Sequence, residues 1–133
     1  MSIQSFFSCT DLEKIKIPST VSYIDYSTFE QSSGNIEVAD GNEKYDDTDG
    51  MLYNKTVTTI IHCPVSYVGN YTLPESVESV GQNAFMNCGE LTGVIFPASL
   101  NCIDKYAFSN SGLTAVEIPS SLIFMCAIHC SRF

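Results

Sequence analysis

The feature that most constrains the fold of this 133-residue chain is a repeat anchored on proline. Pro97 follows Pro74 by 23 residues and Pro119 follows Pro97 by 22, while Pro18 lies 56 residues before Pro74. The positions six, three and one before each proline, and three and six after it, are apolar or aromatic in all four units. One unit alone would expose its apolar face, so the repeat predicts that stacked copies bury a continuous column.

Each repeat predicts a short strand that ends at the proline. Apolar residues alternate before it, as in Val94 and Phe96, which is typical of a strand with one buried face. Proline has no N–H to give to a ladder, and its fixed φ suits a turn. Two residues after proline stands a hydroxyl that can bond a nearby backbone group in the turn, at Thr20, Ser76, Ser99 and Ser121.

The second half of each unit is too short for an α-helix and favours a 3₁₀ turn or a short extended piece. A phenylalanine stands there eleven residues after the first three prolines, at Phe29, Phe85 and Phe108. We expect these rings to fill the interior of the coil, with Phe85 and Phe108 in one core. We also expect Val94 and Val116 on adjacent parallel strands.

The repeat resembles the BspA-like leucine-rich repeats, whose units read roughly L-x-x-I-x-I-P-x-S/T-V-x-x-I-x-x-x-A-F-x-x-C. The segment from Leu91 to Phe108 matches that pattern nearly throughout, and Cys88 and Cys9 stand at the position of its cysteine. The resemblance implies a leucine-rich-repeat solenoid that is mainly β, with a parallel β-sheet and short 3₁₀ or irregular convex segments.

The repeat divides the chain, taken as one domain over 1–133, into six parts. Ile36 and Val38 form a strand if Ala39 replaces the proline, which leaves a long unit before Pro74. We therefore predict a partial repeat over 1–11, repeats over 12–34, 68–90 and 91–112, a long repeat over 35–67 and an incomplete repeat over 113–133. Because solenoids normally cap their ends, these ends predict a fragment or a protein that self-associates through them.

The long repeat contains an insertion that reads as a β-hairpin, because residues 51–53 and 58–61 favour strands and a polar turn lies between them. Tyrosines and aspartates gather in or near it. Tyrosine gives a large contact area at a small entropy cost, so the insertion is a candidate protein-binding patch. Core packing of the hairpin explains the tyrosines equally well. The candidate residues are Tyr45, Asp46, Asp47, Asp49, Tyr53 and Tyr67.

Charge and hydropathy exclude some classes of partner. The net charge of −9 repels nucleic-acid backbones and anionic membranes, and no apolar run approaches the roughly eighteen residues of a membrane helix. The first residues carry neither a basic leader nor an apolar stretch typical of a secretory signal. The six cysteines form no C-x-x-C motif and read as mostly buried thiols.

Catalytic and cofactor motifs are weak. His62 and Cys63 are neighbours on a predicted strand and point to opposite faces, so they do not form a catalytic dyad. A zinc site formed by Cys126, His129 and Cys130 would lack a fourth ligand, so these residues do not predict one. The acidic run before Gly50 does not match a calcium-binding EF-hand loop and favours a solvated loop. We therefore expect no enzyme activity and no cofactor.

The sequence thus predicts a non-enzymatic protein-binding repeat module. The resemblance implies an adhesin-like role at a cell surface, with attachment to host extracellular-matrix proteins or to cells. The alternative is an intracellular scaffold or a truncated fragment of a larger repeat protein. Asn54 and Asn70 lie in N-x-T triplets and would carry glycans only in a secretory pathway.

Overall fold

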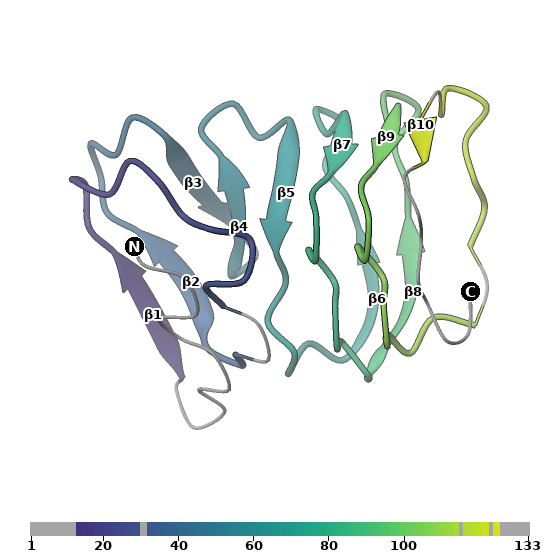
Figure 1. Ribbon diagram of the computed structural model, residues 1–133, viewed down its shortest axis with the longest axis horizontal. Helices are drawn as coiled ribbons and strands as arrows, with labels where there is room; N and C mark the ends of the chain where they lie inside the picture. The colour runs from purple at the N-terminus through teal and green to yellow at the C-terminus, as the bar shows by residue number, and fades with distance from the viewer. Residues whose placement is uncertain (1–12, 30–31, 115, 123, 126–133) are drawn as a thin grey trace.

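The chain winds into a β-solenoid of about four turns, which confirms the predicted architecture (Figure 1). The computed structural model describes residues 13–29, 32–114 and 116–122 and the backbone of 124–125. These residues contain short strands joined by turns, and no helix. The predicted partial repeat over 1–11 and the trio of Cys126, His129 and Cys130 lie outside them.

Strands end next to proline, as the repeat predicts. Strand β1 (Lys14–Ile17) stops directly before Pro18, while β6 (Gly69–Thr72) and β8 (Leu91–Ile95) each stop two residues before a proline. The carbonyl of each proline, Pro64 included, accepts a hydrogen bond from the N–H three residues later, and the Ala39 carbonyl does the same. Ala39 can stand in for proline and also donates its own N–H to the Ile17 carbonyl, at 2.8 Å.

The hydroxyls that follow the prolines join successive coils. Ser76 Oγ donates to the Val57 carbonyl at 2.6 Å, and Ser99 Oγ donates to the Val77 carbonyl at the same distance. Ser66, two residues after Pro64, bonds the Ser33 carbonyl in the same way. The predicted hydroxyl row is present at Ser76, Ser99 and Ser121, where each hydroxyl bonds the preceding coil, although the sequence suggested a bond within the turn.

The parallel ladder is divided between two sides of the solenoid. On one side β1 pairs with β2 (Asn35–Val38), and β6 pairs with β8. On the other side, β5 (Thr59–His62), β7 (Ser79–Val80), β9 (Cys102–Ile103) and β10 (Phe124–Met125) run in parallel. The short extended pieces predicted for the second half of each unit are these strands.

The insertion adds two strands to the sheet of the second side. Strands β3 (Tyr45–Thr48) and β4 (Met51–Asn54) form a tight hairpin, and β4 then pairs antiparallel with β5. The predicted hairpin over 51–61 is present as β4 and β5. Strand β3 is a correction, because its acidic sequence suggested a solvated loop. Its aspartates are accommodated because the strand is only half-buried.

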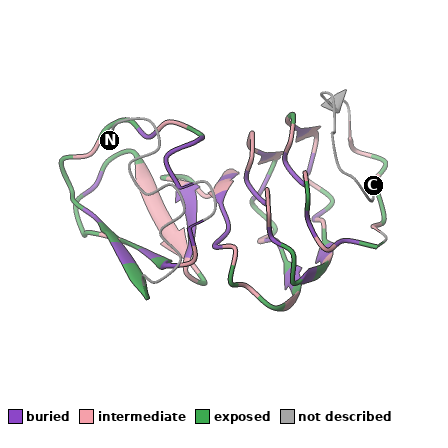
Figure 2. Cartoon of the chain, turned by 60° about the horizontal axis from the view of Figure 1, so that its bottom comes forward, coloured by how far each residue is buried: buried purple, intermediate pink, exposed green. Residues whose placement is uncertain are grey.

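Strand β4 separates two hydrophobic clusters. Met51 and Tyr53 lie in the larger cluster with the C-terminal coils, whereas Leu52 lies in the smaller cluster with Ile15 and Phe29. All three β4 residues are fully buried. Strand β4 is therefore in contact with both clusters, one on each of its faces. Figure 2 shows buried and exposed residues alternating around the coils.

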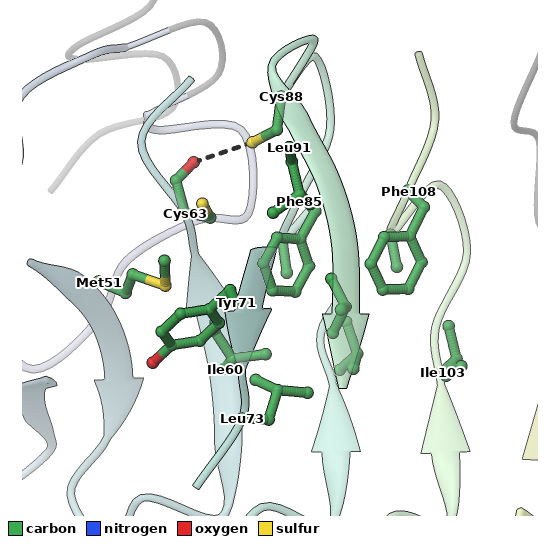
Figure 3. Packing of buried hydrophobic residues seen from close by; sticks show 14 of the residues in the cluster. Met51, Ile60, Cys63, Tyr71, Leu73, Phe85, Cys88, Leu91, Ile103 and Phe108 are labelled. Carbon is green, nitrogen blue, oxygen red and sulfur yellow. Dashed lines mark hydrogen bonds between the residues drawn. The ribbon is translucent and has the colours of Figure 1, made fainter. Parts of the chain in front are cut away.

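Phenylalanines fill the coil interior as predicted. The rings of Phe85 and Phe108 are fully buried and stack at 5.0 Å with an interplanar angle of 8° (Figure 3). Their coils are joined by the Phe85 N–H, which donates to the Ala107 carbonyl at 2.7 Å. In the preceding coil the equivalent rung is Cys63, whose N–H donates to the Ala84 carbonyl. Phe29 is buried in the other cluster.

Two apolar positions depart from the repeat. Val68 is 68% exposed, because a bulge at Gly69 aligns that glycine with Leu91 and shifts Val68 out of the core. Val116 packs against the larger cluster, yet the described residues around it form no strand beside β8. The prediction that Val94 and Val116 lie on adjacent strands is therefore wrong; Val94 pairs with Tyr71 of β6.

The stacked rings predict a large energetic effect. We expect Phe85→Ala or Phe108→Ala to lower the free energy of unfolding by about 3–5 kcal/mol, because each change leaves a cavity in a packed column. Ile95→Ala is the matched control, since Ile95 is 60% exposed. Urea unfolding measures both, and a loss below about 1 kcal/mol at Phe85 would contradict the stacked core.

Candidate functional site

The predicted patch residues do not form one surface. Tyr53 is fully buried in the larger cluster, so it cannot contact a partner. Its hydroxyl lies 2.6 Å from the Tyr71 hydroxyl, and the Tyr71 hydroxyl donates to Asp49 Oδ2 at 3.1 Å. For Tyr53 the structure therefore favours core packing, the second of the two interpretations. The correction could not be read from the sequence, because Tyr53 alternates with residues buried on the opposite face of β4.

The hydrogen-bonded row of Tyr53, Tyr71 and Asp49 attaches the insertion to β6. Asp49 lies in the turn between β3 and β4, with a φ of 57°. Tyr67 packs its ring edge-on against Tyr71, at 5.6 Å, and donates its hydroxyl to the Asn70 carbonyl. Burial raises the pKa of Tyr71 to about 12, so the Tyr71 hydroxyl keeps its proton near neutral pH.

The remaining candidate residues bond the backbone around β3. The Tyr45 hydroxyl accepts a bond from the Ile24 N–H at 2.8 Å, and Asp47 Oδ2 accepts one from the Val38 N–H at 2.7 Å. Asp46 Oδ1 accepts a bond from the Asp47 N–H. In the part of the chain that is described, no group of three or more His, Cys, Asp or Glu side chains is arranged to hold a metal ion.

A tyrosine surface that sequence reasoning missed lies beside Tyr45. Tyr23 and Tyr26 are 63% and 53% exposed, and the Tyr23 hydroxyl donates to Asp25 Oδ2 at 3.3 Å. The negative charge of Asp25, followed by smaller effects including Tyr45 and Tyr26, raises the pKa of Tyr23. These four residues, Tyr23, Asp25, Tyr26 and Tyr45, form what we call the tyrosine surface. The inward position of Ile24 could have predicted that its neighbour Tyr23 points outward.

Asp25 gives this surface a fixed negative charge. Its Oδ1 accepts bonds from both the N–H and the hydroxyl of Ser27, at 3.0 and 2.8 Å. These bonds lower the pKa of Asp25, so the carboxylate is ionised above mildly acidic pH. Ser27 itself is buried, and the loop that carries the tyrosines is thereby held to the solenoid.

His62 and Cys63 face different surroundings. The bulge in β5 places His62 opposite Leu52, and its ring lies 5.2 Å from that of Phe29. Cys63 lies in the larger cluster, where Cys88 Sγ donates to its carbonyl (Figure 3). Hydrogen bonding with Cys88, followed by burial, raises the pKa of the Cys63 thiol, which disfavours a nucleophilic thiolate. Cys63 and Cys88 are buried thiols, as predicted, whereas Cys102 is half-buried.

The two possible glycan acceptors differ in accessibility. Asn54 is half-buried, and its side chain donates to Thr58 Oγ1 and accepts bonds from the N–H groups of Thr58 and Thr59. Asn70 is exposed on β6, and its Oδ1 accepts a bond from the Thr92 hydroxyl. Asn70 is thus the better acceptor of the two.

Fold and site together define a repeat module of the leucine-rich type, with a surface suited to binding another protein. The family model for the BspA type leucine rich repeat region matches residues 1–66 and 65–129, with six copies. The chain therefore belongs to the BspA-type leucine-rich-repeat family. No curated protein matches the chain by sequence. Within the described residues, no helix has the length and apolar character needed to span a membrane.

Solved leucine-rich-repeat structures share the fold. A leucine-rich repeat protein from Eubacterium ventriosum has a TM-score of 0.70 at 24% identity, over 86% of this chain and 32% of its own. The pneumococcal vaccine antigen PcpA has a TM-score of 0.72 at 21% identity, over 92% of this chain and 37% of its own. A leucine-rich cell surface protein from Faecalibacterium prausnitzii has a TM-score of 0.71 at 26% identity, over 86% of this chain and 31% of its own. The chain spans about a third of each.

The buried tyrosine pair can be tested by removing one hydroxyl. We expect Tyr53→Phe to lower the free energy of unfolding by about 0.5–1.5 kcal/mol, because the Tyr71 hydroxyl loses one of its two hydrogen-bond partners and keeps only Asp49. Adding Tyr71→Phe should cost less than the sum of the two single changes, since both remove the same bond. Strict additivity in this double-mutant cycle would contradict the bond. Tyr26→Phe on the exposed surface is the control.

His62 predicts a dependence of stability on pH. Burial lowers the pKa of His62 to about 3 from its ordinary 6.5, and its Nε2 has no hydrogen-bond partner. Between these two pH values only the unfolded chain binds the proton. The free energy of unfolding should therefore fall as the pH drops below about 6.5, by up to about 1.4 kcal/mol per pH unit.

The variant His62→Leu separates this effect from the titration of carboxylates. Its free energy of unfolding, measured in urea at pH 5, 6 and 7, should fall less steeply with acidification than that of the unmodified chain. Equal slopes of unfolding free energy against pH in the two proteins would show that His62 binds its proton equally well in the folded and the unfolded chain, which would contradict this prediction.

Proposed function

We propose that the chain is a non-enzymatic protein-binding module that acts in adhesion and uses its tyrosine surface for contact. The observation that carries this proposal is the pair of exposed rings, Tyr23 and Tyr26, beside Asp25 and Tyr45. Exposed aromatic residues are enriched where proteins bind one another. The proposed contact surface therefore lies mainly on the loop with Tyr23 and Tyr26, whereas the sequence predicted it on the insertion.

The chemistry of the surface favours a partner with basic residues. The hydrogen bonds from Ser27 lower the pKa of Asp25, so this carboxylate is ionised at neutral pH. A lysine or arginine on the partner would meet both a carboxylate and the faces of tyrosine rings, which attract cations. The net charge of −9 would also speed the approach of such a partner.

Adhesion is the finer part of the proposal. It is supported by the family, and by the cell-surface description of the Faecalibacterium protein, which matches this chain at 26% identity. An intracellular scaffold would use the same surface, so location separates the two. Protease treatment of intact cells that leaves the chain uncut, with no glycan at Asn70, would favour the scaffold.

Binding should be tested with point substitutions. Deleting the insertion is unsuitable, because β4 is buried on both faces. We expect the double change Tyr23→Ser and Tyr26→Ser to weaken binding to an immobilised extracellular-matrix protein at least about tenfold, since aromatic anchors each contribute more than about 1 kcal/mol.

The matched control is Val68→Ser, which alters a comparably exposed apolar residue outside the tyrosine surface. It should bind as the unmodified chain does. If a panel of matrix proteins shows binding that the tyrosine changes leave intact, the contact surface is elsewhere. If the folded chain binds none of the panel, attachment to the matrix is not its function.

A further inference from the structure

A groove opens between β8 and the last described coil. It has a volume of about 420 Å³, within the usual range of ligand sites. One wall is β8, with Val94, and the residue after it, Phe96; the other wall is the segment 116–119. Figure 1 shows that segment, in yellow-green, standing apart from β8.

The groove replaces a stretch of ladder. Leu73 N–H donates to the Ile95 carbonyl, so the alternating peptide groups of Val94 and Phe96 point away from β6 and toward the groove. Neither Val94 nor Phe96 forms a backbone hydrogen bond with residues 116–119. The last coil is nevertheless attached before the groove, where the Gly112 N–H bonds the Cys88 carbonyl, and after it, where the Ser121 hydroxyl bonds the Leu100 carbonyl.

The chemistry of the walls specifies an occupant. The backbone groups of Val94 and Phe96 lie at strand spacing, which suits an extended chain that adds to a sheet edge. The side chains of Val94, Phe96 and Val116 offer apolar contacts to every second residue of such a chain. Glu117 supplies the charge of the lining and is exposed, so it would face the other residues.

The chain contains an internal precedent for the charge. Glu37 stands two residues before Ala39, as Glu117 stands two before Pro119. Beside Glu37 lies β1, a strand of alternating lysine and isoleucine, and Lys14 Nζ is 2.7 Å from Glu37 Oε2. An acidic residue at this position of the repeat thus accepts a lysine from a neighbouring parallel strand.

We propose that this groove binds an extended peptide that alternates apolar and basic residues, by adding it as a strand to the edge of β8. The site is separate from the tyrosine surface, so either can fail without the other. Main-chain bonds to Val94 and Phe96 would hold the peptide, and Glu117 would select for its basic residues.

The test uses the full chain and a capped six-residue peptide of alternating lysine and isoleucine. Binding should slow the hydrogen exchange of the Val94 and Phe96 amides, because each gains an acceptor. Replacing lysine by glutamate in the peptide should weaken binding about fivefold, the effect of one exposed ion pair at its upper range. Glu117→Lys should reverse this preference.

A peptide of the same sequence, N-methylated at alternate residues, is the control for strand addition. If it binds as tightly as the parent peptide, the main-chain pairing is wrong. The proposal also fails if the Val94 and Phe96 amides are already protected in the free monomer. Protection that rises with protein concentration alone would assign the groove to a second copy, and perturbation centred on β2 would show competition with β1.

Discussion

The hydrogen bonds between successive coils are the interaction on which the rest of this structure depends. The Phe85 N–H, the Gly112 N–H and the hydroxyls after the prolines all find their acceptors in a neighbouring coil. A coil removed from its neighbours would therefore expose both an apolar face and unpaired polar groups. The side chains that stack along this ladder, such as Phe85 on Phe108, then have little freedom in where they lie.

The insertion solves the problem of a repeat that is too long. Its hairpin leaves the coil path between β2 and β6, yet β4 returns to the core and presents Leu52 to one cluster and Tyr53 to the other. The bulge in β5 then aligns Ile60 with Tyr53 and His62 with Leu52. An unpartnered histidine nitrogen is buried as a result, which links the stability of the fold to pH.

Much of the fold could be predicted from the repeat, because each apolar position has one environment in every stacked coil. Phe85, Val80 and Leu100 are buried where their spacing from proline places them. The repeat could not reveal the bulge that exposes Val68, since its position depends on the pairing of β6 with β8. The site was predicted less well. The exposure of Tyr23 follows from the inward position of its neighbour Ile24, but the burial of Tyr53 depends on a strand that is covered on both faces, which the sequence does not reveal.

Strand β4 joins the two clusters into one cooperative unit, and native-state hydrogen exchange can show whether they open together. Ile36 lies in the smaller cluster, and its N–H donates to the Gly50 carbonyl. Phe85 lies in the larger cluster, and its N–H donates to the Ala107 carbonyl. Both amides should exchange with the same opening free energy, equal to that of global unfolding. An opening free energy several kcal/mol lower at Ile36 than at Phe85 would show that the two halves unfold independently and would contradict this account.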